Sequence, residues 1–276
     1  MILHDSHCHL DFDNFDQDRP EVIVRAKSAD VRFVVVPGVD LPSSAKAQAL
    51  TAQHPGFVYS AAGVHPNYVN GLKIAVLDGI RELAKSPGVV AIGEVGLDYY
   101  RTYSSKEDQK RFLLAQLALA EELELPVILH DRDASVELVP ILLEWQANLT
   151  EDHPLKRRPG VMHAYSADLA VAEPLIESNF YFGVGGPVTY ENARERKEVV
   201  KGLPVERMLL ETDAPFLTPH PHRGKRNEPS YIPLIAEAIA DLHGITAAEV
   251  GKITTRNAIG LFGLPEKGDA DRAGTG

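Results

Sequence analysis

Short apolar runs alternate with longer amphipathic stretches along almost the whole chain. The length of these runs and their content of β-branched residues predict eight strands: Met1–His7, Phe33–Val36, Val58–Ala62, Val89–Gly93, Val127–His130, Val161–His163, Phe180–Val184 and Met208–Asp213. Apolar residues at helical spacing between the strands predict helices at Arg19–Ser28, Ser43–Gln53, Leu72–Lys85, Lys106–Glu124, Ala134–Asn148, Leu169–Glu177, Tyr190–Lys201, Tyr231–His243 and Ala247–Phe262. This alternation is typical of repeated βα units around a parallel sheet.

Eight βα units with no linker or change of composition predict one α/β domain, a closed (β/α)₈ TIM barrel covering residues 1–264. An open doubly wound sheet has the same alternation. No Gly-x-Gly-x-x-Gly motif follows any predicted strand, so the usual dinucleotide-binding form of an open sheet has no support. Residues 265–276, rich in Gly, Asp and Ala, are expected to form a disordered tail.

Polar residues recur directly after the apolar strands. An isolated His-x-His, as in His7-Cys8-His9, is a weak signal, because two close histidines are common in polar loops. In a barrel, however, the C-terminal ends of the strands carry the chemistry. The same position is occupied in five further strands or the loops that follow them, by His65, Glu94, His130, His163 and Asp213. This recurrence, more than any single residue, predicts a functional site.

The residue types at these strand ends indicate a metal centre. Apart from His65, which lies in the loop after its strand, these residues are four imidazoles and two carboxylates. They suit one or two divalent cations such as Zn²⁺ or Mn²⁺, and Mg²⁺ fits mainly where substrate phosphate oxygens complete its shell. With two ions, Glu94 is the candidate bridging carboxylate. Asp213 is the candidate general base for an attacking water.

Composition limits the possible partners. The apolar fraction of 44% is enough for a packed core, and a net charge of −11 argues against a protein that coats nucleic acid through a basic face. The chain has one cysteine, no signal-peptide pattern and no apolar run of membrane-spanning length, so a cytoplasmic protein is expected. Phosphate groups would need local attraction, for which the candidates are Arg132, Arg223, Lys225 and Arg226. Tyr99 and Arg101 are candidates to stack on or clamp a nucleotide.

Residues two apart in a strand point to the same face and so have the same parity, whereas adjacent residues point to opposite faces. This alternation predicts the roles of the residues next to the predicted ligands. Asp5 has the parity of His7 and is expected beneath the site, either supporting a ligand or as a buried structural carboxylate. Glu211 has the parity of Asp213 and is expected to orient a ligand histidine. His4 has the opposite parity and should face the helix layer as a structural histidine, and Cys8 should be a small buried apolar residue.

The assembled motifs resemble the TatD family of metal-dependent deoxyribonucleases, within the amidohydrolase superfamily, over about residues 1–264. The resemblance is carried by His7-Cys8-His9-Leu10-Asp11, Gly63–Pro66, Ile92–Tyr100, Pro126–His130, Leu210–Pro215, Arg223–Pro229 and Asn257–Phe262. It implies a two-metal hydrolase that cuts DNA phosphodiester bonds, in some members from the 3′ end of single strands. It also implies that His65 faces the substrate and that the metal ligands are His7, His9, Glu94, His130, His163 and Asp213.

The chain departs from the family pattern in two places. Asn67 stands where many relatives have a second histidine, and Ala164-Tyr165 stands where Cys-Phe is common. We therefore expect a monomeric deoxyribonuclease, an exonuclease on single strands or DNA ends, with two ions of Mg²⁺, Mn²⁺ or Zn²⁺. RNA remains an open substrate. A hydrolase of a small amide, lactone or phosphotriester is the nearest alternative, and a non-catalytic scaffold barrel is a further one. A basic loop, Arg223–Arg226, favours the charged substrate.

Overall fold

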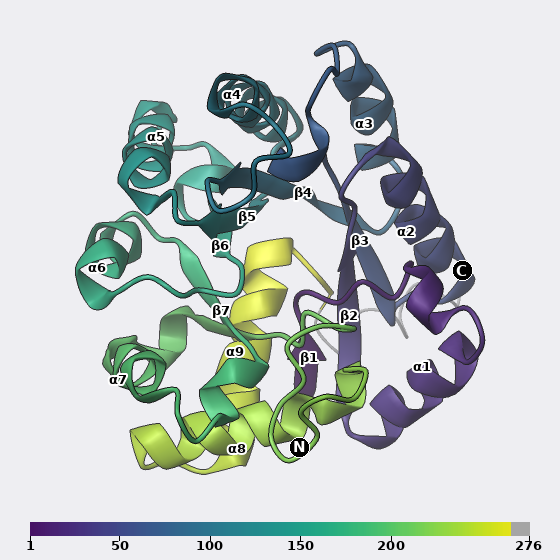
Figure 1. Cartoon of the computed structure of the whole chain (residues 1–276), viewed down its shortest axis with the longest axis vertical. Helices are drawn as coiled ribbons and strands as arrows, with labels where there is room; N and C mark the ends of the chain where they lie inside the picture. Colours follow the sequence, from purple (N-terminus) through teal and green to yellow (C-terminus); the bar gives the residue numbers. More distant parts are fainter. Residues whose placement is uncertain (266–276) are drawn as a thin grey trace.

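The structure, a computed structural model, describes residues 1–265 and has the predicted barrel architecture. Eight parallel strands lie in sequence order, with one or more helices after each (Figure 1). The strands are β1 (Leu3–Asp5), β2 (Val31–Pro37), β3 (Val58–Ala62), β4 (Val89–Asp98), β5 (Val127–Arg132), β6 (Gly160–Met162), β7 (Tyr181–Val184) and β8 (Met208–Leu210). The tail expected from residue 265 onwards falls on residues 266–276, which lie outside the described residues.

Helices α1 to α8 form the outer ring of the barrel in Figure 1. Their bounds are α1 (Arg19–Ser28), α2 (Leu41–Gln53), α3 (Val76–Ala84), α4 (Lys106–Leu123), α5 (Ser135–Asn148), α6 (Leu169–Glu177), α7 (Arg194–Gly202) and α8 (Ile232–His243). A further helix, α9 (Ala247–Phe262), follows. No helix within residues 1–265 is long and apolar enough to cross a membrane.

The apolar core has two layers. Alternate strand residues point into the barrel: Phe33, Val35, Ala61, Ala91, Ile128, Val161 and Leu209. There they pack against Ala258, Leu261 and Phe262 at the end of α9. Strand residues of the other parity pack outward against the helices. Helix α9 therefore fills the interior below the strand ends, and the opposite end of the barrel is left for polar side chains.

The barrel closes through the segment that follows β1. The backbone N–H of Ser6 donates to the carbonyl of Leu210, at 2.9 Å, and that of His9 donates to the carbonyl of Ala214, at 2.8 Å. Between them, the N–H of Asp213 donates to the carbonyl of His7, also at 2.8 Å. Two segments that were predicted to carry site residues thus form the seam of the barrel.

Strand parity was wrong for β1. The strand ends at Asp5, its pairing with β2 shifts register between Leu3 and Asp5, and the chain bends at Ser6, so alternation does not continue to His7. His4 does not face the outer helices. Its ring stacks on Phe33 inside the barrel, and its Nδ1 lies 3.2 Å from the hydroxyl of Thr255 on α9. It is a buried structural histidine, as expected.

Candidate metal centre

Strand β4 brings the carboxylate of Glu94 to the middle of the site. All ten residues of β4 are buried, and glycines on both sides of Glu94 allow a close approach to β5. A Cβ at Gly93 would lie 2.7 Å from the Cβ of Ile128, and one at Gly96, where φ is +146°, would lie 2.0 Å from the carbonyl oxygen of His130. Only glycine fits these two positions, and Glu94 and His130 are thereby held side by side.

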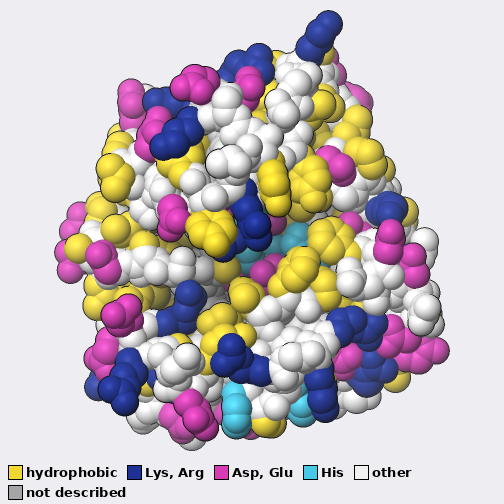
Figure 2. Space-filling view, viewed as in Figure 1, with side chains coloured by type: hydrophobic (Ala, Val, Ile, Leu, Met, Phe, Trp, Pro, Cys, Tyr) yellow, Lys and Arg dark blue, Asp and Glu magenta, His cyan; other side chains and the backbone are white. Residues whose placement is uncertain are grey.

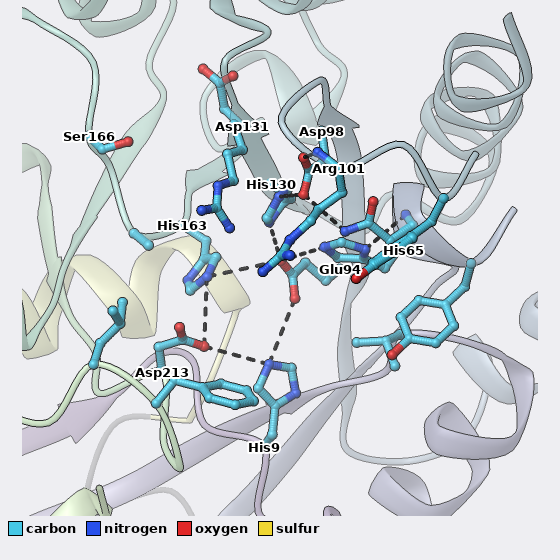
Figure 3. Close-up of a pocket in the computed structure, with 18 of the residues that line it drawn as sticks. His9, His65, Glu94, Asp98, Arg101, His130, Asp131, His163, Ser166 and Asp213 are labelled. Atoms are coloured by element: carbon cyan, nitrogen blue, oxygen red, sulfur yellow. Dashed lines mark hydrogen bonds and ion pairs between the residues drawn. The ribbon is translucent and has the colours of Figure 1, made fainter. Parts of the chain in front are cut away.

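The two oxygens of Glu94 face different imidazoles. Oε2 lies 3.3 Å from Nε2 of His7 and 3.8 Å from Nε2 of His9. Oε1 lies 2.8 Å from Nδ1 of His130 and 4.0 Å from Nε2 of His163. Figure 3 shows His9, His130 and His163 converging on Glu94 from different parts of the barrel. A carboxylate with imidazoles at both oxygens has the arrangement expected of a bridging ligand.

Asp213 closes the group from the β8 side. Its Oδ1 lies 3.6 Å from Nε2 of His9, 3.8 Å from Nε2 of His7 and 3.9 Å from Nε2 of His163. All six predicted ligand residues therefore lie together. Two of the nitrogens, Nε2 of His7 and Nε2 of His9, face each other at 3.2 Å, an arrangement that a shared cation between their lone pairs would stabilise. The donor set fits divalent ions.

Burial sets the charge states of the two histidines after β1. It lowers the pKa of His7 well below its usual value and that of His9 to about 4, so both rings are neutral and can offer a lone pair. Burial alone would raise the pKa of Glu94, but the surrounding imidazoles of His65, His7 and His130 outweigh it and hold that pKa well below its usual value. Burial raises the pKa of Asp213 to about 7, against the opposing charge of His163.

Two further carboxylates contact the site histidines from behind. Glu211, as expected, lies beside His163, with Oε1 3.1 Å from its Nδ1. Asp98, which the sequence did not single out, places Oδ2 3.3 Å from Nε2 of His130. Burial would lower the pKa of each histidine, but these contacts outweigh it: the charge of Glu211 raises the pKa of His163 to about 10, and hydrogen bonds with Asp98 and Glu94 raise that of His130 to about 9. Carboxylates in this position fix the orientation of ligand histidines.

Asp5 does not contact an imidazole. Its Oδ1 accepts hydrogen bonds from the backbone N–H groups of His7, at 3.2 Å, and Thr212, at 2.9 Å, and its Oδ2 contacts the Thr212 hydroxyl at 2.5 Å. Burial raises the pKa of Asp5 to about 8. Of its two expected roles, the structure favours the buried structural carboxylate, which here holds the seam between β1 and β8. Cys8, in the same seam, is buried and unpaired as expected.

A backbone hydrogen bond sets the tautomer of His65. Its Nδ1 accepts a hydrogen bond from the backbone N–H of Asn67, at 3.0 Å, so a neutral ring carries its proton on Nε2. That Nε2 lies 3.5 Å from Oε1 of Glu94 and faces the centre. Although His65, Glu94 and His130 are close enough to hold an ion, this hydrogen bond makes His65 a donor and removes its facing lone pair. His65 also lines the cavity, and its contact with substrate stays a prediction.

A cavity of about 750 Å³ opens above the centre. Two of the predicted phosphate contacts, Arg101 and Arg132, line it, and Figure 3 shows Arg101 reaching over Glu94. The sequence also missed Arg196, on α7, which lines the cavity and donates to the carbonyl of Tyr165 at 3.0 Å. Arg196 was missed because the prediction relied on polar residues that directly follow apolar strands, and Arg196 lies within a helix.

The remaining predicted substrate contacts lie elsewhere. Tyr99 donates its hydroxyl proton to Glu137 on α5, at 2.6 Å, and Lys106 covers its ring. Arg226 forms two 2.7 Å contacts with Asp18. The Arg223 guanidinium lies 4.1 Å from the centre of the Tyr190 ring, and neither it nor Lys225 lines the cavity. The basic loop therefore does not line the cavity, and its arginines contact neighbouring side chains. Its contact with phosphate stays a prediction.

Comparison with known proteins places the chain in a family. The model of TatD-related DNases matches residues 4–263. The chain is 45% identical over 261 residues to the uncharacterized metal-dependent hydrolase YabD of Bacillus subtilis, covering 95% of this chain and 99% of that protein. It is 37% identical over 261 residues to the 3′-5′ ssDNA/RNA exonuclease TatD of Rahnella sp., covering 93% and 96% respectively. The crystal structure of the TatD homologue YJJV from Escherichia coli superposes with a TM-score of 0.86 at 31% identity, covering 95% of this chain and 98% of that one.

Proposed function

This chain belongs to the TatD-related DNase family and is a metal-dependent hydrolase that acts on nucleic acid, and we propose that it removes nucleotides from the 3′ end of single-stranded DNA. The observation that carries the proposal is the position of Glu94. Its carboxylate lies between two groups of imidazoles at the base of a cavity that Arg101 and Arg132 line. A cation site next to guanidinium groups suits a phosphodiester, because both bind negatively charged phosphate oxygens.

The ligands divide into two groups that share Glu94. His7, His9, Asp213 and Oε2 of Glu94 would hold one divalent ion, and His130, His163 and Oε1 of Glu94 the other. Bound there, Mg²⁺, Mn²⁺ or Zn²⁺ would supply positive charge that polarises the phosphodiester and makes water more acidic. Glu211 and Asp98 keep His163 and His130 facing the centre.

The residues around the ions have separate tasks. Asp213 is the more accessible of the two central carboxylates, with 15% of its side chain exposed against 5% for Glu94, so it is the one placed to accept the proton of the attacking water. The Nε2–H of His65 donates to a non-bridging phosphate oxygen. Arg101 and Arg132 bind the negative charge of the phosphates.

The enzyme acts as a monomer of one domain, residues 1–264, in the cytoplasm.

End-labelled substrates test the proposal. The purified protein is incubated with Mg²⁺, Mn²⁺ or Zn²⁺ and with 5′-labelled single-stranded DNA, duplex DNA and single-stranded RNA. A ladder that shortens stepwise from the 3′ end supports it, whereas random fragments indicate an endonuclease. Absence of cleavage, together with hydrolysis of a small amide, lactone or phosphotriester, would establish the alternative. Asp213→Asn tests the proposed proton acceptor. This variant should fold normally and lose activity by about 10²–10⁴-fold, and full activity would refute the role of Asp213.

A further inference from the structure

Basic and apolar side chains both line the cavity. Arg101 and Arg132 are among the basic ones, and Phe12, Phe216 and Leu217 among the apolar ones. In Figure 2, dark-blue Lys and Arg side chains reach the central hollow from its upper left, and yellow hydrophobic side chains lie on several sides of it, including its lower right. The guanidinium groups have a task in binding phosphate. The apolar side chains have none so far.

Phe216 is exposed and yet fixed in place. Its exposed fraction is 52%, so folding gains little from burying its ring. Its backbone is held at both ends: the N–H donates to the carbonyl of Asp213, at 2.8 Å, and the carbonyl accepts from Nδ2 of Asn227, at 2.6 Å. Asn227 is fully buried. A buried amide therefore fixes an exposed aromatic residue relative to Asp213, and such pre-organisation favours binding.

The Phe216 ring belongs to a group of three rings beside the metal centre. Phe12 stacks on His9 with 4.4 Å between ring centres. Phe216 lies edge-on to both, 6.2 Å from Phe12 and 6.4 Å from His9. His9 is one of the proposed ligands, so the aromatic surface begins where the reacting phosphate would sit. Aromatic rings next to a phosphate site are the usual means of binding unpaired bases.

We propose that Phe216, supported by Phe12, is the stacking surface for the base of the terminal nucleotide, whose own 5′-phosphate is hydrolysed. This inference rests on the proposed exonuclease function. One sugar joins that base to its phosphate, and the Phe216 ring is 6.4 Å from His9, so both can be engaged together. A terminal base that is paired in a duplex is held in place by its partner, whereas an unpaired terminal base is free to turn onto the Phe216 ring. The surface therefore favours unpaired ends, and it tolerates any base, because every base has a π-face.

The test compares two 5′-labelled single-stranded oligonucleotides that differ only at the 3′ terminus, which carries either a base or an abasic tetrahydrofuran analogue. The wild-type kcat/KM should be about 10-fold higher with the base present. Phe216→Ala should bring this ratio close to one, and Phe216→Tyr should preserve it. Leu114→Ala removes an exposed apolar side chain on α4, away from the cavity, and should leave the ratio unchanged.

The outcomes separate this inference from the function on which it rests. If wild type hydrolyses neither oligonucleotide, the exonuclease proposal fails. If wild type hydrolyses both at the same rate, or if Phe216→Ala keeps the tenfold ratio, the stacking surface is refuted. If Phe216→Ala folds poorly, Phe216→Leu retains apolar bulk without an aromatic face and should still reduce the ratio. Moving the abasic analogue to the penultimate position should have little effect on wild type, and a larger effect there would also refute the assignment.

Discussion

Asp98 is the clearest test of how the second ion site is held together. Its carboxylate makes four contacts. Oδ1 accepts from the backbone N–H groups of Tyr100, at 3.1 Å, and Arg101, at 2.8 Å. Oδ2 contacts Nε2 of His130, at 3.3 Å, and accepts from Nδ2 of Asn67, at 2.9 Å. Burial would raise the pKa of Asp98, but the His130, Arg101 and Asn67 hydrogen bonds outweigh it and hold the pKa well below its usual value.

Asp98→Asn should separate these two sets of contacts. The amide oxygen can still accept from the loop backbone, so the loop stays in place. The new NH₂ group meets two donors, His130 Nε2–H and Asn67 Nδ2–H, so the restraint on His130 is lost. Removing a carboxylate that orients a ligand histidine typically weakens metal affinity about 10–100-fold, which corresponds to about 1.4–2.7 kcal/mol. Only the ion bound by His130 and His163 should be affected.

Asp5→Asn is the matched control. Because the pKa of Asp5 is raised to about 8, its side chain is protonated at neutral pH, and an asparagine can reproduce its contacts with Thr212 and the N–H of His7. Both affinities should change by less than about 3-fold, since no ligand ring loses a partner. Titration of the metal-free proteins against a competing chelator dye would report two binding steps. Wild-type affinity at both steps in Asp98→Asn, or equal losses in the two variants, would refute the reasoning.

Three further predictions concern the metals, the phosphates and the basic loop. Reconstituted protein should bind two divalent ions per chain, and chelation should lower the midpoint of thermal unfolding, because bound ions stabilise the folded state by about 2.7 kcal/mol at 100 times Kd; fewer than one ion per chain would contradict the ligand assignment. Arg101→Ala should raise KM and reduce the slope of log KM against log salt by about 0.7, whereas Arg111→Ala on α4 should not. Arg226→Met should leave KM unchanged but lower the free energy of unfolding by about 0.5–1 kcal/mol at neutral pH. Since a hydrogen bond from Arg226 lowers the pKa of Asp18 to about 2, that contribution is present above pH 4 and lost as the pH falls towards 2, so urea unfolding of wild type and variant should converge in acid.

The pattern of apolar runs was enough to predict the fold and to place most element bounds within two residues. The eight-strand barrel was confirmed, and α1, α6 and α9 begin and end where expected. Helices α3 and α7 begin four residues later than predicted, at Val76 and Arg194. In α7, the residues before the helix are committed elsewhere: Tyr190, predicted as its first residue, donates its hydroxyl proton to the carbonyl of Thr218. Periodicity shows which residues can form a helix, but it does not show these long-range competitors.

The site was predictable where it depends on strand ends and unpredictable where it depends on distant partners. Glu94 and His130 directly follow the apolar runs with which β4 and β5 begin, and that position was visible in the sequence. Asp98 was missed because β4 was predicted to end at Gly93. The strand in fact continues to Asp98, beyond a second glycine at Gly96. The position of the charge run Arg223–Arg226 outside the cavity was not predictable, because the partner of Arg226 is Asp18, 208 residues away.

The regular alternation of side chains predicted for β1 stops at Asp5, and this affects the metal ligands as well as His4. Strands β1 and β8 have only three residues each, so the barrel is closed mainly by hydrogen bonds between Ser6–His9 and Leu210–Ala214. The same segments present His7, His9 and Asp213. Their side chains are therefore positioned by the seam rather than by regular alternation. It follows that an ion held by these three residues and Glu94 links both sides of the seam, so metal binding and barrel closure stabilise each other.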